Sequence, residues 1–156
     1  MTKVRKGEFR DLAQVLELIK ELADYEHSLH EVTNTVKRME TDGFGDHPIY
    51  GFFVAEREII IIGIAVYYYR YSTWKGKRLF LEDIIVTKTE RGTGIGKLLF
   101  EETMRKSLKD NCTGMMWQVL TWNEPAINFY KRYNAKLDTE WINCSLEATE
   151  IEVLLK

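Results

Sequence analysis

The sequence predicts an α/β fold built on a mixed, mostly antiparallel sheet that is flanked by helices. Two runs rich in β-branched and aromatic residues, 49–56 and 59–71, follow each other with no helical segment between them, which favours a hairpin. A third run, 78–86, is separated from a later strand by an amphipathic segment that opens with a glycine-rich bend. A strand, a helix and a second strand in that order predict one parallel crossover through the glycine-rich helix.

Size and composition favour an ordinary globular protein. The chain has 156 residues with 45% hydrophobic and 29% charged residues, and we expect one domain over residues 1–156. A net charge of −2 gives no indication of nucleic-acid binding. No run approaches the 18 apolar residues of a membrane span, and no apolar N-terminal stretch indicates a signal peptide. We therefore expect a cytoplasmic protein whose cysteines, Cys112 and Cys144, are reduced.

No metal site is expected. His27 and His30 stand three residues apart and would be the candidate pair, but no cysteine cluster supports them. We interpret both histidines as solvated or capping residues.

The N-terminal part is predicted to form a short strand and two helices. The strand covers residues 3–6, and the first helix runs to about Tyr25. Its buried stripe follows helical spacing: Leu12, Val15, Leu16, Ile19 and Leu22. A second, shorter helix is expected from near Thr33 to just before Asp42. The turn near Arg57 lacks a glycine signal, so the register of the following hairpin stays open.

The C-terminal part is predicted to alternate between helices and strands. Ile95, Leu98 and Leu99 mark the buried face of the glycine-rich helix, and a fifth strand covers 115–120. Asn123 is the expected N-cap of a short helix through Tyr130, with Pro125 in its first turn. Two strands, 141–146 and 150–155, are expected to finish the chain; the second alternates glutamate with apolar residues.

The glycine-rich bend is the strongest sign of a ligand. Gly92, Gly94 and Gly96 follow the strand that ends at Val86. The dinucleotide fingerprint fails because Lys97 stands where its third glycine belongs, and the P-loop pattern fails at both of its ends. A glycine bend before a helix still presents free N–H groups and positive potential that suit a pyrophosphate. The alternative is a glycine-rich turn without a ligand.

Several blocks of sequence resemble one known family. The pattern R-x-x-G-x-G between a strand and a helix, here Arg91 to Gly96, resembles the coenzyme A site of the GNAT superfamily of N-acetyltransferases. Further blocks between residues 16 and 141 resemble the diamine and polyamine acetyltransferases and a thialysine-acetylating relative: "LIKELADYE", "DGFGDHPIY", "VAE", "YYY…W…LED", "RGTGIGKLL" and "WNEPAINFYKR". The order of the predicted elements is also that of the GNAT fold.

The resemblance implies that acetyl-CoA is the co-substrate. Its pyrophosphate would lie on the glycine bend: Arg91, Gly92, Thr93, Gly94, Ile95, Gly96 and Lys97. Its pantetheine would pair like an added strand with Ile84, Ile85 and Val86, and the N–H of Ile84 would polarise the thioester carbonyl. Asn123 and Tyr130 would complete the cofactor contacts. A plain sheet core and a simple N-cap are the alternatives, and neither excludes the binding role.

The resemblance also implies an acid and a base. Tyr130 would protonate the departing thiolate, because a phenol of pKa about 10 matches a thiol of pKa about 8.5. Glu82 would accept the proton of the amine, directly or through water. The alternatives are a core tyrosine and an exposed carboxylate. Since side chains alternate along a strand, Asp83 is expected on the opposite face from Glu82.

A cationic acceptor is implied by spaced carboxylates with apolar walls. The residues that match substrate-contacting positions are Tyr25, Glu26, Trp74, Glu82 and Glu140. The segment after "KRYNA" is shorter than in the family, which weakens the match at Glu140, although Asn134 can keep the left-handed turn.

The leading hypothesis is therefore acetyl transfer from acetyl-CoA to a primary amine of a small polyamine or diamine, in a ternary complex. Acetylation of a lysine-like amino acid, or of another amine such as a protein N-terminus, is an alternative. A non-catalytic acyl-CoA-binding module is a third, disfavoured by the presence of Tyr130 and Glu82. The resemblance further implies a homodimer formed through the C-terminal strands, with neither nucleic acid nor membrane as a partner.

Overall fold

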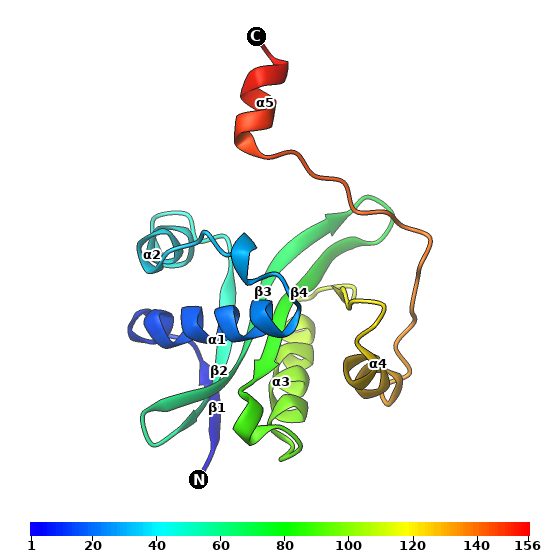
Figure 1. Ribbon diagram of the computed structural model, residues 1–156. Helices are drawn as coiled ribbons and strands as arrows, with labels where there is room; N and C mark the ends of the chain where they lie inside the picture. The colour runs from blue at the N-terminus through cyan, green and yellow to red at the C-terminus, as the bar shows by residue number, and fades with distance from the viewer. The chain divides into compact units, whose positions relative to one another are not determined.

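Five strands form one sheet in the computed structural model, which describes residues 1–156 (Figure 1). In sheet order they are β1 Lys3–Lys6, β2 Gly51–Arg57, β3 Ile60–Ser72, β4 Gly76–Val86 and β5 Met115–Trp117. Neighbours from β1 to β4 pair antiparallel, and β5 pairs parallel to β4. The connection from β4 to β5 runs through helix α3, Ile95–Lys109. The predicted fold class and its single parallel crossover are confirmed.

Helices cover both faces of this sheet. Helix α1, Leu12–Tyr25, and helix α2, Val36–Phe44, pack on one face against a cluster that includes Ile64 and Ile85. Side chains alternate along β3, so Gly63 faces the other way, where Leu99 of α3 lies against it. Phe100 of α3 meets Trp117 of β5 edge to face at 5.2 Å between ring centroids. Three short 3-10 helices complete this part: Phe9–Asp11, Leu29–Glu31 and Lys88–Glu90.

Strand β4 contains a β-bulge at Glu82. Val66 of β3 pairs with Asp83 and Tyr67 pairs with Leu81, so Glu82 has no partner of its own. One extra residue in a strand reverses the alternation of all residues beyond it. Phe80 stacks on Tyr68, which shares its face with the α1 cluster, and Glu82 is on that face too. Because Asp83 alternates with Ile85 of the same cluster, it also points to this face.

Two predicted boundaries in this part are wrong. Helix α2 begins at Val36 because the Thr35 hydroxyl accepts a hydrogen bond from the N–H of Arg38 at 3.2 Å. It continues through Gly43, where the ring of Tyr50 fills the space that a side chain would need. Strand β5 ends at Trp117 rather than at residue 120, because its ladder covers only residues 79–81 of β4 and stops at the bulge.

The chain folds as two compact units, residues 1–118 and 119–156, and each is described by itself. The second unit contains helix α4, Glu124–Lys131, and helix α5, Ala148–Leu154. The two C-terminal strands predicted at 141–146 and 150–155 are absent. Residues 141–146 form neither a helix nor a strand. Glu147 and Glu150 form a capping box that starts α5 instead.

None of the helices combines the length and the apolarity that crossing a lipid bilayer requires.

Candidate active site

The glycine bend leaves an open cradle at the start of α3. Gly92 and Gly94 have φ of 78° and 88°, in the left-handed region that favours glycine. A Cβ built on either residue would meet no atom within 4 Å. The first N–H bonded within the helix is that of Leu98, which donates to Gly94 at 3.2 Å. The N–H groups of Ile95, Gly96 and Lys97 are therefore free to bind an anion.

Gly96 is not required by the protein's own packing. It lies inside α3 with a helical backbone, and an added Cβ would make only an ordinary contact of 3.8 Å with Val86. Alanine at such a position would favour the helix by roughly 0.5–1 kcal/mol. A ligand that approaches the backbone closely explains the glycine better than the fold does.

Glu21 of α1 fixes the segment that leads into the bend. Its carboxylate accepts hydrogen bonds of 2.8 Å from the Thr87 hydroxyl and from the N–H of Lys88. It also lies 3.7 Å from the guanidinium of Arg91. Arg91 in turn donates to the carbonyl of Val86 at 3.0 Å and lies over the ring of Tyr25 at 5.0 Å. The sequence reasoning missed Glu21, because nothing in the local pattern distinguishes it from other glutamates on α1.

Strand β4 has a free edge beyond the bulge. Thr87 donates to Ile62 of β3, so by alternation Ile85 also faces β3, while Ile84 and Val86 face away from it. The ladder with β5 ends at Leu81. The N–H and C=O of Ile84 therefore have no strand partner. A pantetheine arm could pair with this edge as an added strand would.

Three carboxylates gather on the α1 face next to this edge. Burial, together with the charges of Glu82 and Glu26, raises the pKa of Asp83 to about 7. Burial also raises the pKa of Glu26, which follows the last residue of α1. None of the three forms an ion pair. The expectation that Asp83 lies opposite Glu82 is wrong, because the bulge brings both residues to one face.

Tyr68 of β3 borders the same group. Burial, the nearby charges of Glu82 and Asp83 and a hydrogen bond to Glu82 raise the pKa of Tyr68 to about 12. Arg70, two residues farther along β3, is the only cation whose charge lowers the pKa of Tyr68. The acidic group thus has a phenol beside it but no basic partner.

Trp74 is not brought together with the carboxylates. It lies in the turn between β3 and β4, and 86% of it is exposed. From Gly76 to Glu82 the strand spans about 20 Å at the usual rise per residue. An aromatic wall close to Glu82 comes instead from Tyr68.

The remaining predicted residues lie in the second unit. The Asn123 side chain accepts a hydrogen bond from the N–H of Ala126 at 3.3 Å, which confirms it as the N-cap of α4. Tyr130 is buried near the end of α4, with the Phe129 ring edge-on to it at 5.4 Å. Asn134 has a φ of 54°, the left-handed turn expected of it. Glu140 is exposed, and its N–H donates to Asp138.

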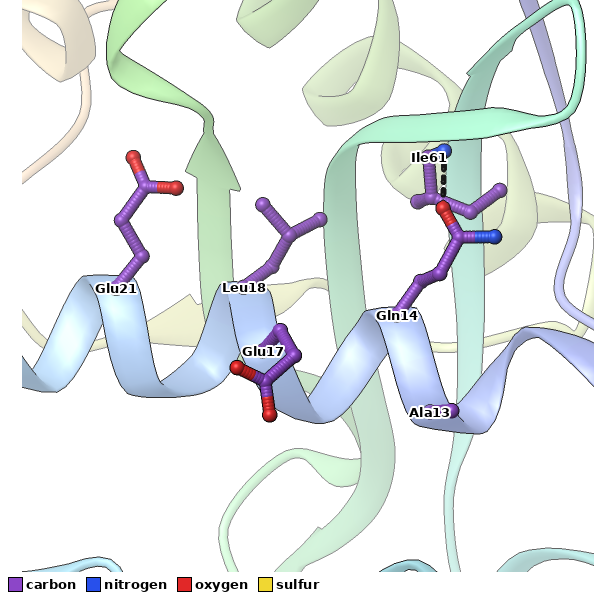
Figure 2. A pocket seen from close by; sticks show the side chains of 6 residues that line it. All are labelled: Ala13, Gln14, Glu17, Leu18, Glu21 and Ile61. Carbon is purple, nitrogen blue, oxygen red and sulfur yellow. Dashed lines mark hydrogen bonds between the residues drawn. The ribbon is translucent and has the colours of Figure 1, made fainter.

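A shallow pocket lies beside α1. It is lined by Ala13, Gln14, Glu17, Leu18, Glu21 and Ile61 (Figure 2). Gln14 reaches across to β3, where its side-chain oxygen accepts the N–H of Ile61 at 2.9 Å. This hydrogen bond connects α1 to the start of β3.

Comparison with known proteins identifies the family. The acetyltransferase (GNAT) family model matches residues 12–134. The chain belongs to the GNAT acetyltransferase family. It is therefore an acetyl-CoA-dependent N-acetyltransferase.

Individual relatives agree with this assignment. A mouse thialysine N-epsilon-acetyltransferase is 32% identical over 98% of this chain and 96% of its own length. A human spermidine/spermine N(1)-acetyltransferase-like protein 1 is 35% identical over 82% of this chain, but this match covers only 19% of that longer protein. A solved integron cassette protein from V. cholerae has the same fold, with a TM-score of 0.79 at 20% identity over 99% of this chain and 98% of the other.

The cradle can be tested at Gly94. Gly94→Ala places a methyl group in the open space above the free N–H groups, so we expect at least a tenfold rise in the KM for acetyl-CoA, equal to about 1.4 kcal/mol. Gly76→Ala is the matched control, because Gly76 has a similar φ of 84° and begins β4, at the opposite end of that strand from the bend. Both variants carry the same backbone strain of about 1–2 kcal/mol. Equal KM values in the two variants would remove the pyrophosphate from this bend.

Proposed function

We propose that this acetyltransferase acts on a primary amine of a small polyamine or diamine. The observation that carries the proposal is the group of Glu26, Glu82 and Asp83, three carboxylates on one face without a cation among them. Like charges that close together raise each other's free energy, and a ligand with more than one ammonium group relieves that cost. The human relative named for spermidine and spermine supports the same class of acceptor.

The acetyl donor fits the first unit. We assign its pyrophosphate to the bend from Arg91 to Lys97, where free N–H groups and an open cradle suit a diphosphate. We assign its pantetheine to the free edge of β4, which includes Ile84 and Val86. When bound, acetyl-CoA supplies an activated acetyl thioester. The N–H of Ile84 is then the donor placed to polarise the thioester carbonyl.

A second candidate is a lysine-like amino acid. The mouse relative is named for thialysine, an amino acid with a side-chain amine. Such a substrate also carries a carboxylate, which needs a positive partner. The group of Glu26, Glu82 and Asp83 offers none, and this favours the polyamine or diamine.

The residues 1–156 are proposed to work as one catalytic domain, since the family match at residues 12–134 runs through both compact units. Its two free cysteines, Cys112 and Cys144, suit the reducing cytoplasm, which we propose as its location.

The acceptor class can be tested with a panel of amines and acetyl-CoA, reading thiol release. Spermidine and 1,4-diaminobutane should exceed a monoamine of equal length by at least tenfold in kcat/KM, because one charged hydrogen bond is worth roughly 1.5–3 kcal/mol. Added salt should narrow the gap, since partly exposed pairs are screened. Glu26→Gln should narrow it too while sparing the monoamine. Equal kcat/KM values at low salt would contradict the polyamine class, and a preference for lysine or thialysine would favour the second candidate.

The acid can be tested at Tyr130. Tyr130→Phe keeps the buried ring and removes only the hydroxyl, so the kcat should fall by about 10²–10⁴-fold with little change in the affinity for acetyl-CoA. Tyr133→Phe is the control, on a neighbouring tyrosine for which we propose no catalytic role. A Tyr130→Phe enzyme with the full kcat would show that another group protonates the thiolate.

The C-terminal segment is proposed to form a homodimer. Trp141 and Ile142 are 78% and 86% exposed, and Leu146, Val153 and Leu155 are exposed as well. Such a run of apolar side chains is costly in water and favours a second copy of the chain as cover. Light scattering should give twice the chain mass of 18.4 kDa, and truncation after residue 139 should give a monomer. A full-length chain that remains monomeric at high concentration would contradict the proposal.

A further inference from the structure

Asp83 is an unusual carboxylate for a sheet. Its side chain is half-buried on the α1 face of the sheet, and no hydrogen bond or ion pair of its side chain accompanies that burial. A buried carboxylate without a partner is costly for a fold. The bulge at Glu82 is what turns its side chain toward α1.

The groups that face Asp83 come from three elements. Glu82 lies beside it on β4, Glu26 faces it from the end of α1, and Tyr68 faces it from β3. Arg70 lowers the pKa of Tyr68 from farther along β3 but is not among the charges that shift the pKa of Asp83. Asp83 is thus surrounded by acidic or neutral groups. One residue after it, Ile84 presents its N–H at the free edge of β4.

We propose that Asp83, and not Glu82, accepts the proton from the attacking amine, directly or through one water. This inference rests on the proposed function, in which the thioester carbonyl lies at Ile84 and the polyamine enters between Glu26 and Glu82. Glu82 then holds the cationic chain, and Asp83 is the catalytic residue.

The proton balance is as follows. The ammonium group gives one proton to the Asp83 carboxylate and becomes a neutral amine. Its nitrogen lone pair forms the C–N bond to the thioester carbonyl carbon, and the C–S bond breaks. The departing sulfur gains one proton, and the nitrogen loses a second proton as it becomes the amide nitrogen. Asp83 finally releases its proton to water, so one proton appears in solution for each amide formed.

Two observations favour Asp83 over Glu82 in this step. Glu82 is exposed, and its carboxylate is engaged by the Tyr68 hydroxyl. Asp83 is half-buried and has no such partner. Burial and the charges of Glu82 and Glu26 raise the pKa of Asp83 to about 7, near the pH at which a general base works best. A carboxylate of ordinary pKa, about 4, is a far weaker base toward an ammonium.

The test is the pH dependence of kcat/KM for spermidine in three enzymes. The wild type should gain activity through an inflection near pH 7, as Asp83 loses its proton in the free enzyme. Asp83→Asn should lower kcat/KM by about 10²–10⁴-fold and abolish that inflection. Glu82→Gln should keep the inflection but move it to lower pH, because one of the charges that raise the Asp83 pKa is gone. The KM for acetyl-CoA should be unchanged in both variants.

Thermal melts check that Asp83→Asn folds. A raised native pKa means that the folded protein holds this proton more tightly than the unfolded chain does. The wild type should therefore lose stability as the pH rises from about 4 to 7 and recover none above it. Asp83→Asn lacks that loss of stability. The melting temperature of the variant minus that of the wild type should therefore be larger above pH 7 than below pH 4.

The outcomes separate this proposal from the proposed function. If spermidine is acetylated and Asp83→Asn keeps both its rate and the inflection, Asp83 is not the base and the acceptor class still stands. If Glu82→Gln is the variant that abolishes the inflection, Glu82 is the base. If the wild type acetylates no polyamine or diamine, the proposed function fails and this assignment fails with it.

Discussion

The β-bulge at Glu82 is the constraint on which the candidate site depends. One extra residue in β4 reverses both the side-chain face and the hydrogen-bonding direction of every residue that follows it in the strand. Before the bulge, Leu79 bonds toward β5; after it, Ile84 turns its N–H to an edge that β5 does not reach. The same reversal brings Asp83 beside Glu82. A free donor and a pair of carboxylates thus arise from a single irregularity.

The residues after the bulge keep their positions only if the end of β4 is also held in place. Glu21 on α1 holds Thr87 and Lys88, and Arg91 folds back onto the carbonyl of Val86. These contacts connect α1 to the two residues that follow β4 and then to the glycine bend. The cradle for an anion and the free edge of β4 are therefore held by the same helix. A loss of the Glu21 carboxylate would loosen both at once, although Glu21 itself lies on neither.

The sequence predicted the regular parts of this fold and missed the irregular ones. The apolar stripe of α1, the N-cap at Asn123 and the left-handed turn at Asn134 depend on neighbouring residues alone, and periodicity or residue type is enough to predict them. The bulge depends on how two distant segments pair, so strict alternation misplaced Asp83. The segment 150–155 alternates like a strand, but a strand needs a partner, and the local capping box of Glu147 and Glu150 produced a helix instead. Family resemblance selected Glu82 and Tyr130, which no local pattern could distinguish from core or surface residues.

Two residues of the first unit contradict what stability alone would favour. Gly96 occupies a helical position where a methyl group would fit, and Asp83 is a half-buried carboxyl with acidic neighbours and no cation. Residues that weaken a fold without a structural reason tend to mark sites that act on a ligand. Gly96 lies where a diphosphate would approach the backbone. Asp83 lies where, in the proposal above, an ammonium group would lose its proton. Between them on β4, the N–H and C=O of Ile84 lie on the edge that no strand pairs. The two residues that lower the stability of the fold, Gly96 and Asp83, thus lie where the thioester of acetyl-CoA and a cationic amine would have to meet.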